Sequence, residues 1–556
     1  MPRNNSLDYL KTTFRYIAII LCLFSTFANQ YNLSIDGVTY IDIADGYLRH
    51  DWISAINGGY GPLYSWILAF GMFILNPTAF WESTYIYLVN FLIYLFTIFC
   101  FEVFLNKLIN FIKRTSHFPE KELIILSYSL FIFCSVKSIG FHLQTPDMLL
   151  SGLIYLTIAL LLHFAQNTGT IISYILFGSI LGLNYLAKEA MFPIAFVFLI
   201  ISTFAFKNIK KKFIFLVTAF IGFTLISGPF IFALSKNRGV FAYCETAKLN
   251  YALNVNEMPP DCFNLSENRN NKPSLIKKIS SKPLIYEYGE TFNMSTFPLV
   301  YDNTYWYPGI KPYFDLKKQL KTLYFNIKTY FDFYLYEQGE LIFGLLLLFY
   351  LNERKKIIFK NLAQNWILII PSIFVLVMYS LVSVELRYVG VFILLLWIGL
   401  FLSTYTQESK KLLSSIVLTI LVITALRTIP VISSNFYHIY KNLVLGKEAN
   451  INWIIAENLR QKGIKEGDQI AMLWEGYSAY FARLSRVNVR EDLWDPLDDF
   501  WRADLEIKSK IVKTFSEIGL KAVVAENIPS YALPHAIKAG WERIGQTEHH
   551  VYFLKK

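Results

Sequence analysis

Long uncharged apolar runs limit most strongly what this chain can fold into. Examples lie at residues 16–28, 171–187 and 213–232, where no Asp, Glu, Lys or Arg occurs. A helix needs about 20 apolar residues to cross the hydrocarbon core of a bilayer, and these runs approach or reach that length. Hydrophobic residues make up 54% of the 556 residues and charged residues only 17%. The sequence therefore predicts a polytopic α-helical membrane protein rather than a soluble domain.

Short basic clusters between the apolar runs predict the topology. They hold much of the excess behind the formal net charge of +11, at Lys107, Lys113 and Arg114; Lys207, Lys210, Lys211 and Lys212; Arg354, Lys355, Lys356 and Lys360; and Lys410 and Lys411. Lys and Arg concentrate in cytoplasmic loops, which explains the clusters better than a nucleic-acid surface does, so we expect no nucleic-acid partner. Because Arg3, Lys11 and Arg15 precede the first run, we place the N-terminus in the cytoplasm.

The apolar segments predict about eleven transmembrane helices. They lie at residues 16–28, 82–105, 122–137, 147–165, 170–187, 190–206, 212–234, 336–352, 365–383, 387–405 and 411–433. The segment 62–75 is also apolar, but it is short for a span and is bounded by Gly61-Pro62 and Asn76-Pro77. If this segment crossed the membrane, the later basic clusters would lie outside. We therefore interpret it as an interfacial helix.

Two hydrophilic regions complete the predicted division of the chain. Residues 1–433 form the transmembrane domain, in which 35–80 is an external loop with its interfacial helix and 235–335 is a long external loop. The long loop is either a lid or acceptor-binding surface, or a segment packed against other external elements. Residues 434–556 predict an extracytoplasmic α/β domain, because helical apolar spacing ends at Gly463 and Gly519 and strand-like runs follow. This domain contains no nucleotide loop, metal pattern or nucleophile motif, so we expect an accessory role.

The polar stretch 36–64 holds four acids between two apolar segments: Asp36, Asp42, Asp45 and Asp51. Charge close to hydrocarbon is costly and usually has a partner or a task. The predicted topology places further ionisable residues on the same external face, namely Asp147, Lys188, Glu189, Glu385 and Arg387, with Tyr388 beside them. Acids and bases are therefore expected to meet above one helical bundle.

A carboxylate that faces several cations beside lipid suits one chemistry well. The carboxylate deprotonates an acceptor hydroxyl, while the cations hold the phosphate of a lipid-linked sugar as it leaves. Simpler roles remain open for each group. Asp36 and Asp147 also suit helix capping or salt bridges, and Lys188 and Arg387 also suit snorkelling at the interface. Among the remaining acids, Asp42, Asp45 and Asp51 are expected to solvate and shape the loop around Asp36.

Five cysteines fall into two groups. Cys22, Cys100 and Cys134 lie in apolar runs and are expected to be packed thiols. Cys244 and Cys262 both lie in the predicted long external loop. They either form a disulfide or remain two free thiols, and the sequence leaves both alternatives open.

The polar stretch resembles a known family. Asp36, Tyr40 and Ala44, then Gly58-Gly59 and Gly61-Pro62-Leu63-Tyr64, resemble the signature of the GT-C membrane glycosyltransferases. The likeness is nearest to bacterial relatives of the protein O-mannosyltransferases, the lipid A aminoarabinose transferase and the rhizobial core-oligosaccharide transferases. It continues through Thr145-Pro146-Asp147, Leu186-Ala187-Lys188 and Glu385 to Tyr388. Many relatives have an acidic pair where this chain has Asp36-Gly37, and Pro-Pro where it has Gly61-Pro62.

The resemblance implies an inverting transferase with a polyprenyl-phosphate-linked sugar donor and a glycan, lipid or protein acceptor outside the cytoplasm. It implies that Asp36 is the general base and Asp147 a second acidic group, with Lys188 and Arg387 as phosphate contacts. Three tyrosines, Tyr40, Tyr64 and Tyr388, are expected to shape the loop and the substrate site. A bacterial inner membrane follows from the same likeness, and a divalent cation is left open as a cofactor.

Two other functions remain as alternatives. A transporter or flippase for a polyprenyl-linked glycan also needs charges near lipid, but at mid-membrane depth on broken helices, often with two related halves. We find no convincing internal repeat in the sequence. The third reading is a non-catalytic protein of envelope assembly, to which Gly37 in place of a second acid points.

Overall fold

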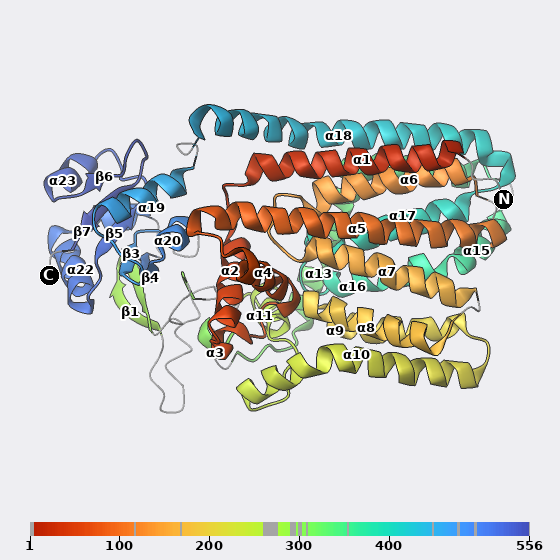
Figure 1. Ribbon diagram of the computed structural model, residues 1–556, viewed down its shortest axis with the longest axis horizontal. Coiled ribbons are helices and arrows are strands. Elements are labelled where there is room, and N and C mark those ends of the chain that lie inside the picture. The colour runs from red at the N-terminus through yellow and green to blue at the C-terminus, as the bar shows by residue number, and fades with distance from the viewer. Residues whose placement is uncertain are drawn as a thin grey trace.

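The computed structural model describes residues 5–115, 118–166, 169–258, 276–289, 296–298, 303–306, 310–352, 355–446, 450–474, 479–493 and 497–554. Long helices form a bundle, and a β-sheet with its own helices lies at one end of that bundle (Figure 1). The N-terminus lies at the opposite end of the bundle, and the C-terminus lies in the sheet region (Figure 1). The short helices α2 (Ile35–Leu48), α3 (Trp52–Ala55), α4 (Pro62–Leu75) and α11 (Thr246–Asn254) lie between these two parts (Figure 1).

Seven helices within the described residues are long and apolar enough to cross a membrane. They are α1 (Asn5–Asn29), α5 (Ala79–Thr115), α6 (Glu120–Phe133) with its π-helical continuation η1 (Cys134–Ile139), α7 (Asp147–Ala165), α10 (Ile209–Arg238), α17 (Leu386–Thr404) and α18 (Lys410–Leu445). An eighth span results if α15 (Lys355–Gln364) and α16 (Trp366–Ser380), which meet at a bend of 77°, count as one. The chain is therefore an integral membrane protein.

The predicted count of about eleven spans is not confirmed, because several predicted spans are short helices. These are α8 (Ile171–Ala187), α9 (Met191–Ser202) with η2 (Thr203–Ala205), and α14 (Gln338–Tyr350). Although α8 is short, it packs against α10 over most of its length, because glycines allow the backbones of the two helices to approach closely. A Cβ atom on Gly178 would lie 1.7 Å from the Ala219 carbonyl oxygen, and one on Gly222 would lie 2.3 Å from that of Ile175.

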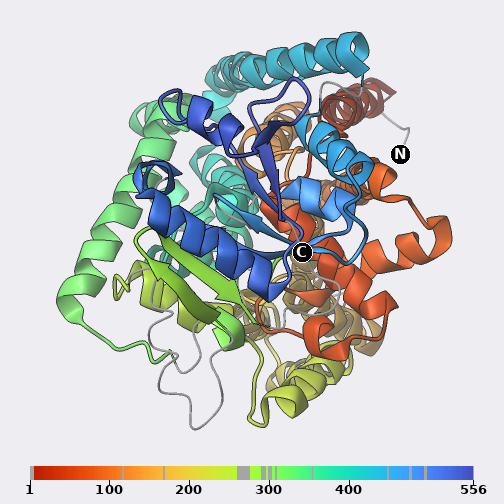
Figure 2. The same ribbon diagram turned by 90° about the vertical axis from the view of Figure 1, so that its left-hand side faces the viewer.

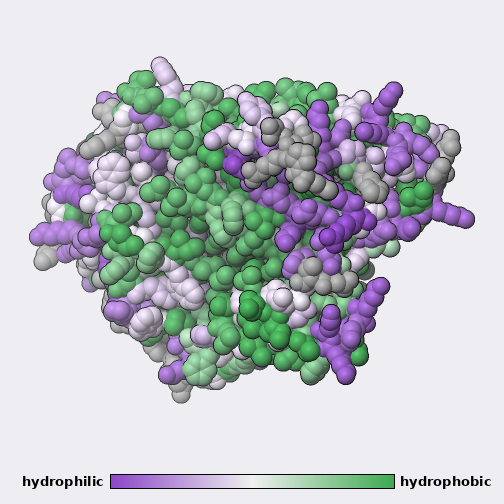
Figure 3. All heavy atoms as spheres, turned by 45° about the vertical axis from the view of Figure 1, so that its right-hand side comes forward, coloured by the Kyte–Doolittle hydropathy of each residue, from purple (hydrophilic) through white to green (hydrophobic). Residues whose placement is uncertain are grey.

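Large apolar side chains cover much of the bundle's outer surface. Figure 3 shows a broad hydrophobic area on one face, with hydrophilic side chains toward both ends. Exposed members on α10 include Phe213, Phe220, Leu225 and Phe232. Such an area is far larger than soluble monomers expose, and contact with lipid tails explains it.

The stretch expected to be a polar loop is largely helical. It contains α2 (Ile35–Leu48) and α3 (Trp52–Ala55), followed by α4 (Pro62–Leu75). The Ser34 hydroxyl caps α2 by accepting a hydrogen bond from the Gly37 N–H at 3.1 Å. Pro62 begins α4, where a proline loses no helical hydrogen bond. The bounds of α4 match the predicted segment 62–75; its interfacial position stays a prediction.

The sheet has seven strands in the order β1-β2-β4-β3-β5-β7-β6. Their bounds are β1 (Ile276–Ser281), β2 (Leu284–Tyr288), β3 (Gln469–Met472), β4 (Asn488–Leu493), β5 (Ala522–Ala525), β6 (Glu542–Arg543) and β7 (His550–Phe553). The central β4, β3 and β5 run parallel, and the outer pairs are antiparallel. The first two strands come from the region 235–335, which the sequence predicts to be a long external loop, so this region contributes to the same sheet as the C-terminal region.

Helices and apolar side chains cover both faces of the sheet. The helices of this region are α19 (Ile451–Gln461), α20 (Tyr480–Ser485), α21 (Leu497–Arg502), α22 (Leu505–Ile518) and α23 (Leu533–Lys538). Figure 2 shows α22 crossing the outer face of the sheet. As predicted, α19 and α22 end at glycines with positive φ, Gly463 at 93° and Gly519 at 92°. The domain boundary at residue 433 stays a prediction; α18 continues beyond it to Leu445.

Three more helices in the region 235–335 lead back to the bundle. They are α11 (Thr246–Asn254), α12 (Asn303–Trp306) and α13 (Leu316–Asp332), which continues into η4 (Phe333–Glu337). Of these, α11 begins beside the turn that joins α8 to α9, because the Thr246 hydroxyl donates to Glu189 at 2.9 Å.

Candidate active site

One cavity at the sheet-facing end of the bundle collects the charged residues that the sequence singles out. It encloses about 840 Å³, counting the solvent at its mouth. Seven segments line it: the start of α2, the turn before α4, the start of α7, the α8–α9 turn, the start of α11, the end of α16 and the start of α17. Asp36, Asp147, Lys188 and Arg387 all line this cavity, although they come from four separate parts of the chain.

The side chain of Asp36 projects from the first turn of α2 and pairs with Arg387. Its Oδ2 lies 2.9 Å from Nη1 of Arg387, and both side chains remain partly exposed. A second nitrogen of Arg387, Nη2, donates to the Tyr388 hydroxyl at 3.2 Å. The carboxylate that the sequence predicts to be the base is therefore held by a cation at the cavity wall.

Asp147 and Lys188 form a second ion pair in the same cavity. Lys188 Nζ lies 2.6 Å from Oδ1 of Asp147, and the Thr145 hydroxyl donates to Oδ2 at 2.8 Å. The Lys188 ammonium also lies 3.1 Å from the centre of the Tyr388 ring, a cation–π contact. Burial lowers the pKa of Lys188, while the neighbouring Asp147 carboxylate opposes that shift.

The three expected tyrosines take different positions. Tyr40 and Tyr388 line the cavity. Tyr64 is fully buried and supports Tyr40 edge-on, with ring centres 5.0 Å apart, while its hydroxyl donates to Asn90 at 2.7 Å. Burial raises the pKa of Tyr40 well above its usual value, so its phenol stays neutral.

A close backbone contact holds the two sides of the cavity together. Gly61, just before α4, lies against the end of α8, where a Cβ atom would be 2.6 Å from the Ala187 carbonyl oxygen. Glycine at position 61 therefore allows the turn before α4 to pack directly beside Lys188.

Glu189 also lines the cavity. The sequence predicts it on the same external face as the other charged residues, but it is not one of the predicted site residues. It is 5% exposed, and its Oε2 accepts hydrogen bonds from Thr246 and from the Cys244 thiol at 3.3 Å. Burial raises the pKa of this carboxyl to about 8. Its position directly after Lys188, in an otherwise apolar turn, is the signal by which it could have been found.

Two expectations on ligands and bonding remain open. The possible disulfide between Cys244 and Cys262 is not tested, because Cys262 lies outside the described residues. Cys244 itself lines the cavity. No group of three or more His, Cys, Asp or Glu residues in the described part of the chain is placed to hold a metal ion, and the divalent cation stays an untested expectation.

A buried cluster of five charges joins α2 to the C-terminal region, and the sequence does not predict it. Arg483 of α20 lies 2% exposed and pairs with Asp42 and Asp45 of α2 and with Glu82 of α5. Its Nη1 donates to Asp42 at 2.7 Å, and two of its nitrogens donate to Glu82 at 2.9 Å. Arg486 adds contacts to Asp45 and Glu82.

The cluster corrects the expectation that Asp42 and Asp45 face solvent. The two carboxylates are 7% and 5% exposed, and the backbone N–H of Thr296 also donates to Asp42 at 2.9 Å. Burial raises the pKa of Asp42 to about 6, against the opposing effect of Arg483. These acids tie the helix that carries Asp36 to the sheet region.

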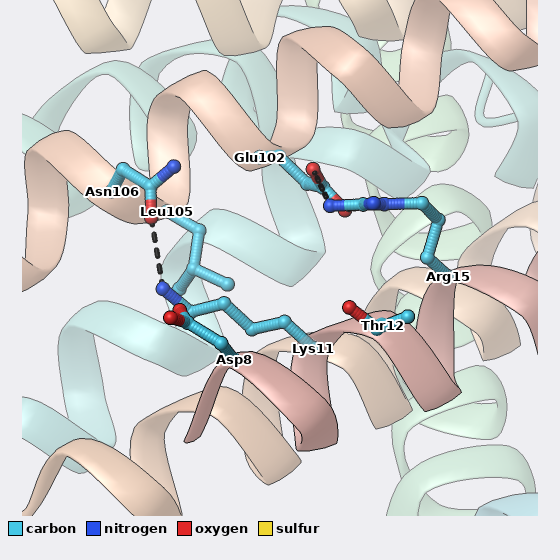
Figure 4. A pocket seen from close by; sticks show the side chains of 7 residues that line it. All are labelled: Asp8, Lys11, Thr12, Arg15, Glu102, Leu105 and Asn106. Carbon is cyan, nitrogen blue, oxygen red and sulfur yellow. Dashed lines mark hydrogen bonds and ion pairs between the residues drawn. The ribbon is translucent and has the colours of Figure 1, made fainter. Parts of the chain in front are cut away.

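A second cavity, between α1 and α5, has no comparable arrangement. Figure 4 shows that four of its polar side chains are engaged in pairs: Lys11 with Asn106 at 2.9 Å, and Arg15 with Glu102 at 2.7 Å. The Tyr128 hydroxyl also donates to Glu102 at 2.6 Å. We therefore place the candidate active site in the cavity around Asp36.

The whole arrangement defines the class of protein that the polar stretch predicts: the chain has the GT-C fold of membrane glycosyltransferases. The particular likeness is to ArnT from Cupriavidus metallidurans. In the apo state its TM-score is 0.52 at 12% sequence identity, and the match covers 98% of each chain. For the same protein bound to undecaprenyl phosphate, the TM-score is 0.51, with the same identity and coverage. At this identity the likeness establishes the fold.

A weaker structural similarity links the chain to an oligosaccharyltransferase from Archaeoglobus fulgidus in complex with Zn and sulfate. Its TM-score is 0.47 at 13% identity, and the match covers 92% of this chain and 68% of that one. No protein-family model matches the chain, and no curated protein matches it in sequence.

Proposed function

We propose that this chain is an inverting glycosyltransferase that moves a sugar from a polyprenyl-phosphate-linked donor to a glycan, lipid or protein acceptor outside the cytoplasm. The observation that carries the proposal is the meeting of one carboxylate, Asp36, with two cations, Arg387 and Lys188, in a cavity at the end of a membrane bundle. The fold supports it, because ArnT, which shares this fold, has been seen with undecaprenyl phosphate bound.

In this proposal Asp36 is the general base. Its carboxylate accepts the proton of the acceptor hydroxyl as that oxygen attacks the anomeric carbon, and the bond from this carbon to the phosphate oxygen breaks on the opposite face. The pairing with Arg387 at 2.9 Å describes the site before substrate binds. A donor phosphate competes for Arg387, because guanidinium binds phosphate oxygens in bidentate fashion, and so releases Asp36 toward the acceptor.

Lys188 gives the second positive charge for the phosphate. Its ammonium has three N–H donors, and the structure uses one on Asp147 at 2.6 Å. Asp147 then serves to orient Lys188, and Thr145 fixes Asp147 in turn. Together with Arg387, Lys188 stabilises the negative charge that grows on the departing phosphate.

We further propose that the cavity faces the extracytoplasmic side of a bacterial inner membrane. Basic residues gather at the other end of the bundle: Lys113 near the end of α5, Lys210 at the start of α10 and Lys410 at the start of α18. That end also carries the N-terminus (Figure 1). Positive charge concentrates on the cytoplasmic side of membrane proteins, so the sheet region lies outside.

The proposal is tested with the purified full chain in lipid nanodiscs and a panel of radiolabelled undecaprenyl-phosphate sugars. We expect the chain to release undecaprenyl phosphate and transfer label to an acceptor fraction from cell envelopes. A transporter would instead move the intact labelled lipid between leaflets of a vesicle without cleaving it. Cleavage with transfer supports the proposal, whereas movement of intact donor, or binding with neither event, overturns it.

A further inference from the structure

The turn between α8 and α9 carries a carboxyl group that the proposed chemistry does not use. Glu189 follows Lys188 directly and lines the same cavity, where it is 5% exposed. Its Oε2 accepts from Thr246 at 2.9 Å and from Cys244 at 3.3 Å. Its Oε1 has no hydrogen-bond partner among the described residues.

An unpartnered carboxyl oxygen in a buried position is rare. Buried polar atoms are nearly always hydrogen-bonded, because removal from water without a replacement partner is unfavourable. The nearby cations are engaged elsewhere: Lys188 pairs with Asp147 at 2.6 Å, and Arg238 pairs with Glu245 at 2.8 Å. Glu189 thus lines the cavity as a buried acid without a paired cation among the described residues, and its Oε1 is closed to solvent and unpartnered, so this oxygen meets a ligand only when the side chain turns toward the cavity.

The cavity lining holds two chemically different groups of residues. Asp36, Arg387 and Lys188 are charged and meet around Tyr388, which suits a phosphate and a reacting hydroxyl. Glu189 and Thr246 are joined by a hydrogen bond of 2.9 Å, and with Asn250 they form a group without a cation. Because burial keeps the Glu189 carboxyl protonated near neutral pH, it both donates and accepts hydrogen bonds, as a neutral hydroxyl does.

We propose that the Glu189 side chain turns its Oε1 toward the cavity and binds a hydroxyl group of the donor's sugar ring through it, while Thr246 holds Oε2. This inference rests on the proposed function. The sugar is covalently joined to the phosphate, so a phosphate held by Lys188 brings the ring beside the next residue in the turn. A site built to hydrogen-bond a sugar hydroxyl discriminates strongly against a sugar that lacks it, and Glu189 is thereby a specificity-determining residue.

The test measures binding in an Asp36→Asn background, which stops turnover. Two probes are compared on the full chain in nanodiscs: undecaprenyl phosphate alone, and the undecaprenyl-phosphate sugar that the parent transfers. Glu189→Leu should weaken binding of the sugar-bearing lipid by about tenfold or more and leave undecaprenyl phosphate unchanged. Glu189→Gln keeps a donor and an acceptor and should stay close to the parent. Glu385→Gln, on the same face but outside the cavity lining, is the matched control.

If Glu189→Leu folds poorly, donors whose sugar lacks one hydroxyl group at a time provide a second test on the parent chain. One deoxy donor should bind the parent about tenfold more weakly and should lose nothing further in Glu189→Leu, because both changes remove the same contact. Equal binding of the full donor by parent and Glu189→Leu overturns the inference, as does equal weakening of both lipids or a parent that tolerates every deoxy donor. If the parent binds undecaprenyl phosphate but no sugar-bearing lipid, both this inference and the proposed function are wrong.

Discussion

Two ion pairs set the charge of the candidate site. Asp36 is held by Arg387, and Asp147 is held by Lys188, so both acids face cations. The pairs differ in burial: Asp147 is 2% exposed, whereas Asp36 and Arg387 are partly exposed toward the cavity. In the proposed mechanism Asp36 is therefore the acid that an acceptor reaches, and Asp147 is the acid that orients Lys188. All four residues stand at helix ends near predicted span mouths, which is why the sequence could single them out.

Replacing Lys188 separates its two proposed tasks. Lys188→Met leaves the buried Asp147 carboxylate without its cation, and loss of one member of a buried pair costs about 3–5 kcal/mol of unfolding free energy. The double variant Lys188→Met with Asp147→Asn removes that penalty. We expect the double variant to regain thermal stability and still bind undecaprenyl phosphate more weakly than the parent. Full recovery of binding in the double variant would show that Lys188 only neutralises Asp147.

Glu189 predicts a particular dependence of stability on pH. Its pKa is raised to about 8 in the fold from an ordinary value near 4.5. Between these values the unfolded chain releases a proton that the folded chain retains, so unfolding becomes easier as pH rises. In thermal unfolding, the stability of Glu189→Gln relative to that of the parent should increase between pH 5 and pH 8, by a few kcal/mol at most. A difference that does not change with pH would contradict the buried, protonated carboxyl.

At the scale of elements, α2 links the cavity to the sheet. Its first turn carries Asp36, and its later turns carry Asp42 and Asp45, which pair with Arg483. The sequence could predict α4 and α7 with their bounds because each is a continuous apolar run beside a proline. It could not predict α2, whose acids look solvated until a partner is known, and that partner lies 441 positions from Asp42. The strands β1 and β2 are not predictable for the same reason, since β2 pairs with the distant β4 and β1 pairs only with β2.

The charge cluster predicts that Arg483 positions α2. Arg483→Met leaves Asp42, Asp45 and Glu82 with Arg486 alone, and we expect a loss of about 3–5 kcal/mol in stability, together with loss of transfer. Adding Asp42→Asn should restore part of the stability, because one uncompensated charge is removed. Arg502→Gln, at an exposed residue whose contacts are with Asp498 on its own helix and with the exposed Tyr531, should change neither quantity measurably. Normal stability of Arg483→Met, measured by thermal unfolding, would contradict the account.

On the scale of the whole molecule, the helix ends that carry the basic clusters lie at the end of the bundle opposite the sheet (Figure 1), and the cavity is lined by residues at the sheet-facing end. Hydropathy and charge predicted this polarity because membrane insertion depends on the same two properties. The number of spans is harder to predict from the sequence. The helices α8, α9 and α14 are apolar but short, and helix length decides whether such a segment crosses the membrane.

The polarity is tested by thiol labelling of intact cells. Cysteines introduced at Lys513 on α22 and at Lys210 at the start of α10 are both on exposed residues. In a background without Cys244 and Cys262, a membrane-impermeant maleimide should label Lys513→Cys in intact cells, and Lys210→Cys only after lysis. The reverse pattern would place the sheet in the cytoplasm.

The rate of sugar transfer in Asp36→Asn tests the central claim most directly. Asparagine keeps the size of the side chain and removes its basicity, and a general base typically contributes 10²–10⁴-fold. With donor at saturation, we predict that Asp36→Asn transfers radiolabelled sugar at least about 100-fold more slowly than the parent while binding the donor as well. Asp51→Asn, in the same polar stretch but outside the cavity lining, should transfer at the parental rate. Transfer by Asp36→Asn at the parental rate would contradict the role of Asp36.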